Sequence, residues 1–224
     1  FGVNAASDVK TDGAVVSGSF PVNGNLMSVA NATDLGRVTL SGYSNQPTAA
    51  NTAINPADNQ ELFRFVLTSY NQELNVERLK LTAVGSIQTA DLQNLKLYIS
   101  GTQVGSAIQL TNTANGNIAD FDLSGSPLVI PKGGAKTVSL RGDIKNGSTR
   151  TFYFSFQNQQ DLTVKDNSYN VYVEPYAAGS WSAIKPDGNY QVSTGTLSVA
   201  RSTDAPTQDV AVDANNVVLG AWDF

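Results

Sequence analysis

Neither cysteine nor histidine occurs among the 224 residues of the chain. The absence of cysteine excludes disulfides and thiolate chemistry. The absence of histidine removes the commonest general base, the usual partner of a nucleophilic serine and the commonest ligand of transition metals. Asp120 and Asp122 share one strand face as a pair of acids, but a polar outward face accounts for them. We therefore expect the protein not to be an enzyme and to need no cofactor.

Charge and long apolar runs are also scarce. Asp, Glu, Lys and Arg make up 15% of the residues, whereas about a quarter is usual in soluble domains. The net charge of −5 argues against a nucleic-acid partner, because such surfaces need clustered Lys and Arg. No apolar run approaches the ~18–20 residues of a membrane-spanning helix. A weakly charged chain rich in Asn, Gln, Ser and Thr is typical of extracellular β proteins, and we expect a location at the cell surface.

What the sequence does contain is an alternation of apolar and polar residues with a period of two. The run ERLKLTAV (77–84) places its apolar side chains on one face and Arg, Lys and Thr on the other. Similar runs occupy 61–68, 95–100, 106–111, 118–124, 127–131, 136–144, 150–157, 162–166 and 169–175. Short turn segments separate them, and Asn146-Gly147 predicts a type I′ hairpin turn. The pattern predicts an all-β, antiparallel sandwich of Ig-like or jelly-roll type.

An internal repeat links the C-terminal stretch to an earlier one. The aligned pairs lie 159 positions apart: Gly36 with Gly195, Pro47 with Pro206, Phe63 with Trp222 and Phe65 with Phe224. Their order and spacing predict a module about one such period long. On this basis residues 46–200 form a complete sandwich, and residues 1–45 are the closing strands of a preceding module. Residues 206–224 are the first strand of a following module or a donor strand.

The two aligned stretches resemble module junctions in bacterial cell-surface and S-layer-type proteins, in which Ig-like β-sandwiches recur in tandem. They read GTLSVARSTDAPTQDVAVDANNVVLGAWDF and GRVTLSGYSNQPTAANTAINPADNQELFRFVLT. The stretches VERLKLTAVGS, LQNLKLYISGTQVG and LVIPKGGAKTVSLRGDI resemble the middle of such modules. The resemblance covers residues 18–224. It implies a structural or adhesive extracellular role and carries over no catalytic residue.

The C-terminal run contains four side chains that need burial, Val217, Leu219, Trp222 and Phe224. An unpaired strand of this kind exposes both its backbone ladder and its apolar face. Strand addition to a second copy would cover both, and a heterologous contact of this type extends into a fibre. We therefore expect a structural subunit of a surface layer or filament that assembles head to tail with copies of itself. Pairing with a flanking module of the same parent chain is the other possibility.

The alternative function is that of a carbohydrate-binding or adhesin module. Trp181, Tyr172 and Tyr176 are the aromatic side chains that would form a platform for cell-surface glycans. For calcium, which prefers oxygen ligands, the candidates are Asp161 and Asp166, which flank a short run. Solvated turn carboxylates explain such acidic clusters without a metal, because Asp and Asn are standard turn formers.

Overall fold

The computed structural model of the chain describes residues 2–25, 33–42, 46–175, 183–194, 199–207 and 209–223. Two units are distinguished, Phe1–Asp34 and Leu35–Phe224. Within the described residues the regular elements are β-strands, apart from two 3-10 helices, η1 (Ala6–Asp8) and η2 (Gln159–Asp161). The predicted all-β fold class is thereby confirmed.

The N-terminal unit contains a two-stranded antiparallel sheet, in which β1 (Gly2–Val3) pairs with β2 (Val22–Asn23). Asp8 holds the turn η1, because its Oδ2 accepts the N–H groups of Asn4 (3.0 Å) and Ala5 (3.1 Å). None of the residues that the structure describes in this unit is buried. Its described part therefore has no hydrophobic core.

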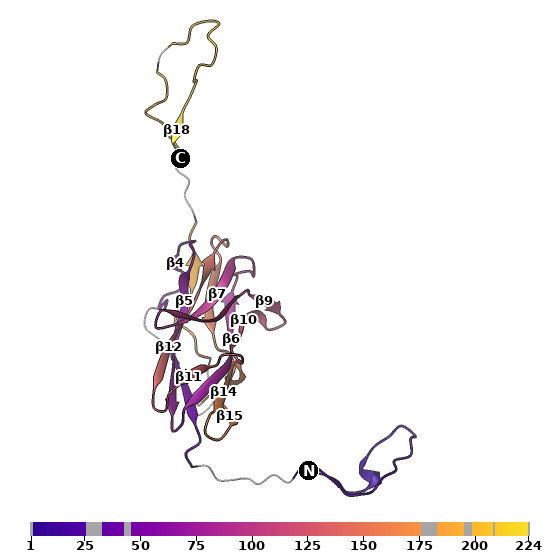
Figure 1. Cartoon of the computed structure of the whole chain (residues 1–224). Coiled ribbons are helices and arrows are strands. Elements are labelled where there is room, and N and C mark those ends of the chain that lie inside the picture. The colour runs from indigo at the N-terminus through magenta and orange to yellow at the C-terminus, as the bar shows by residue number, and fades with distance from the viewer. Residues whose placement is uncertain are drawn as a thin grey trace. The chain divides into compact units, whose positions relative to one another are not determined.

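The second unit contains a β-sandwich of two sheets (Figure 1). The smaller sheet has five antiparallel strands in the order β3 (Arg37–Gly42), β5 (Gln60–Tyr70), β12 (Ala135–Ile144), β7 (Leu92–Ile99) and β8 (Thr102–Ile108). The larger sheet has nine strands, built around β6 (Leu74–Gly85). Its other members are β4 (Thr52–Ile54), β9 (Thr111–Thr113), β10 (Gly116–Asp122), β11 (Leu128–Ile130), β13 (Thr151–Ser155), β14 (Leu162–Asp166), β15 (Val171–Val173) and β16 (Tyr190–Val192).

Strand β6 organises the larger sheet because it is long enough to pair with four strands. Strands β14 and β13 pair with successive parts of one edge, and β11 and β10 pair with the other edge. Strand β16 pairs with β13, and β4 runs parallel to β16 at the margin of the sheet. The orders β3-β5-β12-β7 and β6-β13-β16 correspond to the A-B-E-D and C-F-G orders of an immunoglobulin-type sandwich.

Apolar side chains at alternate positions of the two sheets fill the core between them. Phe63 and Phe65 of β5 meet Phe156, which follows β13, and all three are at most 1% exposed. The ring centroids of Phe65 and Phe156 lie 4.9 Å apart with an angle of 84° between the rings, an edge-to-face geometry that aromatic pairs favour. This cluster joins one sheet to the other.

The chain enters and leaves the sandwich at opposite ends (Figure 1). Where it enters, the Gly36 N–H donates to Asp166, which lies opposite Leu74 at the start of β6. Where it leaves, the Ser193 N–H donates to the Ile54 carbonyl beyond the other end of β6. Strand β6 has 12 residues and, at a rise of ~3.3 Å per residue, spans roughly 36 Å between the two ends.

The boundary of the sandwich differs from the expected one at residue 46. All six residues of β3 pair with β5, from Arg37 opposite Tyr70 to Gly42 opposite Phe65, and Val38 is fully buried. The strand assigned to a preceding module is therefore the first strand of this sandwich. The polar, turn-like segment after it leads from the smaller sheet to β4 in the larger sheet, so its composition marks a change of sheet within the domain.

The turn predicted at Asn146-Gly147 also differs. Strand β12, which precedes it, lies in the smaller sheet, whereas β13, which follows it, lies in the larger sheet. Gly147 has a φ of +94°, but the segment connects two sheets and is not a hairpin. The prediction of a type I′ hairpin here was wrong, because local turn preference does not specify which sheet receives the next strand.

Candidate functional sites

Near its C-terminus the chain forms a second small antiparallel pair, β17 (Ala200–Arg201) with β18 (Trp222–Asp223). Three residues of the predicted assembly strand lie in the described part, and Phe224 lies outside it. Of the three, Trp222 belongs to β18, whereas Val217 and Leu219 precede it and are not in a strand. Trp222 is 63% exposed and Leu219 is 80% exposed, while Val217 is 39% exposed. These apolar side chains are presented to solvent within the described part of the chain.

The pairing of β17 with β18 resembles the pairing of β3 with β5, since both are antiparallel, but it has two residue pairs in place of six. In the sandwich, Gly42 lies opposite Phe65, and a shift of 159 positions carries this pair to Arg201 and position 224. The structure pairs Arg201 with Trp222, two positions earlier. A displacement of two residues keeps every side chain on the same face of its strand. Both strand pairs are therefore antiparallel, and side chains at equivalent positions lie on the same face of their strands.

Equivalent positions in the two pairs differ in burial. Phe63 of β5 is 1% exposed, whereas Trp222, its counterpart in the repeat, is 63% exposed. Strand β5 has β3 on one edge and β12 on the other, with the larger sheet over its apolar face. Among the described residues, β18 pairs with β17 on one edge and with no strand on the other. In the described part of the chain, no second sheet covers the C-terminal pair, whereas the larger sheet covers β5.

Of the three aromatic residues predicted to form a glycan platform, the structure places Tyr172, while Trp181 and Tyr176 lie outside the described residues. Tyr172 belongs to β15 and is 65% exposed. Its hydroxyl donates to Glu77 Oε2 over 2.9 Å, and this bond raises the pKa of Tyr172. Lys165 Nζ lies 5.9 Å from the centroid of its ring.

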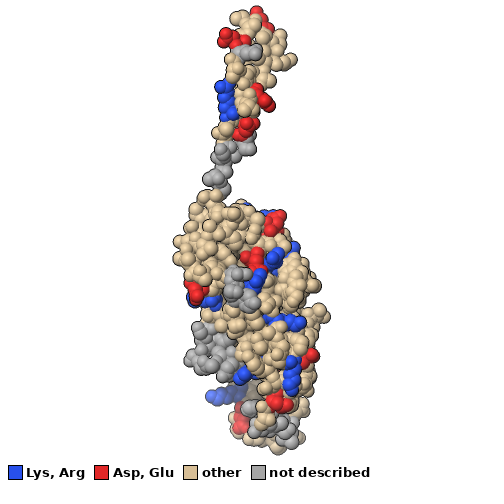
Figure 2. All heavy atoms as spheres, turned by 90° about the vertical axis from the view of Figure 1, so that its left-hand side faces the viewer, with Lys and Arg blue, Asp and Glu red and all other residues tan. Residues whose placement is uncertain are grey.

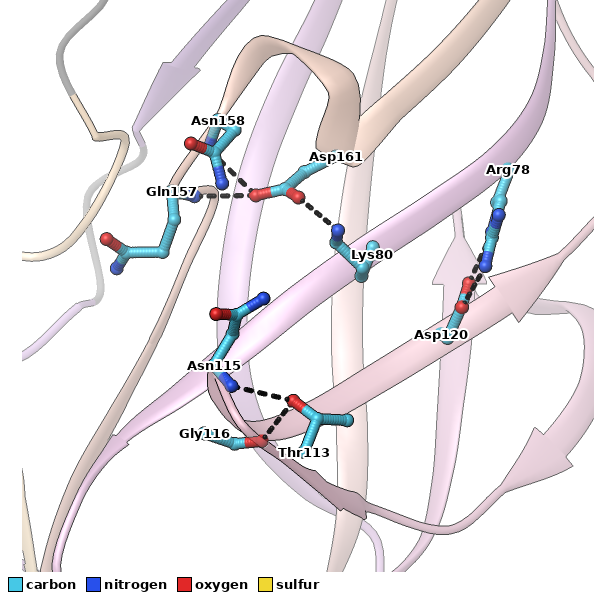
Figure 3. A network of polar contacts seen from close by, with 9 residues as sticks. All are labelled: Arg78, Lys80, Thr113, Asn115, Gly116, Asp120, Gln157, Asn158 and Asp161. Carbon is cyan, nitrogen blue, oxygen red and sulfur yellow. Dashed lines mark hydrogen bonds and ion pairs between the residues drawn. The ribbon is translucent and has the colours of Figure 1, made fainter. Parts of the chain in front are cut away.

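The two calcium candidates lie at the two ends of β14, and both are buried. Asp161 Oδ2 accepts the N–H groups of Gln157 (2.8 Å) and Asn158 (2.9 Å), and Lys80 Nζ lies 2.8 Å from Oδ1 (Figure 3). Asp166 accepts three backbone N–H groups, two on Oδ1 and one on Oδ2. These partners give both carboxylates a role in holding loops. In the described residues, no group of three or more acidic side chains is placed to hold a metal.

The outer face of the larger sheet carries a second ion pair beside this one (Figure 3). Arg78 of β6 donates to both carboxylate oxygens of Asp120 on β10, with Nε 2.8 Å from Oδ1. The hydrogen bond and the charge of Asp120 raise the pKa of Arg78. Hydrogen bonds from Ser124 lower the pKa of Asp122, the other acid of the pair seen in the sequence. Asp120 is thus engaged as a cross-strand ion-pair partner.

A hollow of about 470 Å³ lies on the smaller sheet, and the sequence did not single it out. Thr137 and Ser139 of the central strand β12 form its floor. Ser139 lies opposite Arg64 of β5 on one side and Tyr98 of β7 on the other. The guanidinium of Arg141 lies 5.7 Å from the Tyr98 ring centroid. Two arginines and an aromatic ring thus surround small hydroxyl side chains.

An irregularity in the pairing of β5 with β12 shapes this hollow. Leu140 lies opposite Phe63 and Arg141 opposite Glu61, so Leu62 is an extra residue on β5. Leu62 is 1% exposed, and Glu61 shares the face of Arg141. Arg64 Nη2 donates to Glu61 Oε2 over 2.5 Å, with side chains 26% and 20% exposed respectively. Bulges of this kind re-aim side chains.

A buried acid supports one end of the hollow. Asp143 Oδ1 accepts the Asn59 N–H over 2.9 Å, and Oδ2 accepts Asn94 Nδ2 over 2.7 Å. The bond from Asn94, followed by that from Asn59, lowers the pKa of Asp143, because hydrogen bonds to the charged form favour it. The Asn59 carbonyl in turn accepts a long bond of 3.5 Å from Arg141 Nη1. The position of Arg141 is therefore coupled to a fixed loop.

Comparisons with known proteins add little to this description. No family model matches the chain, and no curated protein matches it. Eight chains of solved structures match. One of them, described as the structure of the N-terminal domain of PorA, is 14% identical with a TM-score of 0.25, over 70% of this chain and 97% of that chain. In the part of the chain that the structure describes, no helix has the length and apolarity needed to cross a membrane.

Proposed function

We propose that the chain belongs to an extended extracellular structural protein, a surface layer or filament, in which β-sandwich modules join head to tail by strand pairing. One observation carries the proposal. The C-terminal pair β17–β18 is antiparallel as β3 and β5 are, in a register shifted by two residues, yet Trp222 is 63% exposed where its counterpart Phe63 is 1% exposed. A strand pair of this type needs a partner that supplies the remaining sheet.

Burial of the exposed apolar side chains would stabilise the contact with such a partner. Complete burial of an exposed large apolar side chain contributes about 1.5–3 kcal/mol before ordering costs, and Leu219 and Trp222 have more exposed surface to bury than Val217. Backbone ordering costs about 1–2 kcal/mol per residue, so a partner must add backbone pairing and must bury further surface. An added strand along the second edge of β18 supplies that backbone pairing.

The positions of the chain at the two ends of the sandwich support a linear arrangement. Gly36 marks one end of β6 and Ser193 the other. A contact that joins one end of a module to the opposite end of the next is heterologous, and it extends into a line unless a rotation closes it. This is the geometry of a fibre, a lattice row or a stalk. The cell-surface resemblance of the sequence agrees with it.

The decisive experiment compares the assembly of the chain with that of Leu219→Ser/Trp222→Ser. Light scattering after size exclusion, at about 1–100 µM, is expected to show assemblies larger than the 23.7 kDa monomer, and electron microscopy to show linear particles. The double variant is expected to remain monomeric. Its unfolding midpoint should be unchanged, because both side chains are exposed.

The matched control is Val15→Ser, which removes an apolar side chain that is 93% exposed in the N-terminal unit. This variant is expected to assemble as the unchanged chain does, because Val15 lies outside the C-terminal strand pair. If the chain without substitutions stays monomeric over the whole concentration range, self-assembly is refuted. Equal loss of assembly in Val15→Ser would refute the assignment of the contact to the C-terminal strand.

A further inference from the structure

We propose that the hollow on the smaller sheet is a binding site for an acidic saccharide, a sugar chain that carries carboxylates. The site is separate from the strand pair discussed above and does not depend on the proposed assembly. Its lining residues are Asn59, Glu61, Arg64, Tyr98, Ser100, Gly101, Thr137, Ser139 and Arg141. The volume of about 470 Å³ falls within the usual range of ligand sites.

The shape of the hollow follows from strand pairing. Strand β12 is the middle strand of the smaller sheet and contributes two short hydroxyl side chains, Thr137 and Ser139, followed on the same strand by the long side chain of Arg141. The neighbouring strands contribute long side chains opposite Ser139, Arg64 and Tyr98. Because long side chains flank short ones on both sides, the surface above Ser139 forms a trough. Because both edges of β12 are already paired, its ladder offers no place for an added strand.

The charge of the hollow favours an anion. Arg64 and Arg141 line it together with one acid, Glu61. Lys96 lies opposite Arg141 on the neighbouring strand and therefore on the same face. Within the lining, two arginines against one acid leave an excess of positive charge, although the whole chain carries −5; Lys96 and the acid Asp143 both lie outside the lining. Charged side chains are sparse on the side of the molecule shown in Figure 2. Arginine is the side chain best suited to paired hydrogen bonds with a carboxylate.

The remaining lining favours a sugar over a peptide. The residues that line the hollow include no aliphatic side chain, whereas grooves for amphipathic helices and proline-rich peptides are lined by apolar side chains. It offers instead an aromatic ring and groups that bond to hydroxyls, at Tyr98, Ser139 and Asn59. The C–H face of a pyranose packs against an aromatic ring, and its hydroxyls exchange hydrogen bonds with small polar groups.

The support behind the hollow shows a site that is ordered before a ligand arrives. Arg64 and Glu61 are paired, with side chains no more than 26% exposed on the face of a sheet. Asp143 fixes Asn59, which contacts Arg141. Pre-ordered side chains lower the entropy cost of binding. The ion pair with Glu61 sets the direction of the Arg64 guanidinium, and the 3.5 Å bond to the Asn59 carbonyl restrains Arg141.

The test measures binding of three acidic probes, a galacturonate hexamer, a hyaluronan hexasaccharide and sialyllactose, to the full chain. Chemical-shift changes of the 15N-labelled protein are followed up to about 5 mM probe. We expect at least one probe to bind, with shifts on β5, β7 and β12. The methyl-esterified form of the binding probe, which lacks the negative charge, is expected to bind at least about tenfold more weakly. Binding should also weaken between about 50 and about 500 mM NaCl.

Three variants locate the site. Arg141→Ala and Tyr98→Ala are each expected to weaken binding at least about tenfold, and Ser139→Gln to do so by filling the floor while keeping every charge. The matched controls are Lys165→Ala and Tyr172→Ala, a cation and an aromatic side chain in contact on the other sheet, which should leave binding unchanged. The proposal is overturned if no acidic probe binds, if the methyl ester binds equally well, or if the control variants lose as much binding as the three others.

Discussion

Asp166 fastens the chain at the end where it enters the sandwich, and Asp166→Ala is expected to be strongly destabilising. The carboxylate is fully buried. Its Oδ2 accepts the N–H of Gly36 over 2.7 Å, a contact between segments 130 residues apart. Its Oδ1 accepts the N–H groups of Ser168 (2.8 Å) and Tyr169 (3.1 Å). One side chain thus joins the start of β3 to the turn after β14.

The expected loss in the free energy of unfolding follows from the hydrogen bonds that the three backbone amides lose. A buried donor left without an acceptor costs about 1–3 kcal/mol, and a hydrogen bond to a charged group contributes about 1.5–3 kcal/mol. The Gly36 amide is buried in this contact, whereas those of Ser168 and Tyr169 are part-buried and regain bonds to water. We therefore expect a total loss of about 3–5 kcal/mol. With a slope of about 4 kcal/mol per molar guanidinium, the midpoint falls by about 1 M.

Guanidinium unfolding followed by far-ultraviolet circular dichroism measures this shift. Asp166→Asn keeps an acceptor oxygen and should lose less than Asp166→Ala. The control is Asp58→Ala, since the side chain of Asp58 is 73% exposed and its partner is Lys145. Exposed pairs contribute little, so its midpoint should move by less than about 0.2 M. A loss in Asp166→Ala no larger than in this control would show that the buried contact is not what holds β3 in place.

Two further predictions concern Asp143 and the repeat. Hydrogen bonds hold the pKa of Asp143 below its ordinary 3.8, so its contribution to stability is present above about pH 4 and lost as the pH falls through the folded-state pKa. Asp143→Asn should therefore cost about 1 kcal/mol at neutral pH and less near pH 2, and an equal cost at both would contradict this. Appending a copy of residues 66–194 after Phe224 should complete a second sandwich and shift Trp222 fluorescence to the blue. The same chain with Trp222→Phe supplies the baseline, and unchanged Trp222 emission would refute the repeat.

Strand positions were predictable from the sequence because alternation is a local property of a half-buried strand. The runs 61–68, 77–84 and 136–144 lie inside β5 (Gln60–Tyr70), β6 (Leu74–Gly85) and β12 (Ala135–Ile144). Each strand places its alternate residues against the same core, so the pattern needs no knowledge of the partner strand. The sandwich class followed from the number and spacing of such runs.

What the sequence did not reveal depends on contacts between distant strands. The trough around Ser139 requires Arg64 and Tyr98 to lie opposite it, which register alone determines. Its shape also depends on an extra residue, Leu62, that looks like any other apolar strand residue. The usable signal was a set of outward positions carrying Arg, Tyr and Ser on three predicted strands. Without the register, that set is indistinguishable from an ordinary polar face.

The exposure of Trp222 constrains what kind of partner the C-terminal strand pair accepts. An isolated two-stranded sheet is marginally stable in water, so the partner must supply most of the stability. In the sandwich, the counterpart Phe63 is covered by Phe156 of the opposing sheet, with ring centroids 6.4 Å apart. A partner for Trp222 must likewise present an apolar sheet face together with a strand for the second edge of β18. A module of the same type provides both at the required spacing, whereas a flat glycan surface provides neither, and this favours joining between like modules.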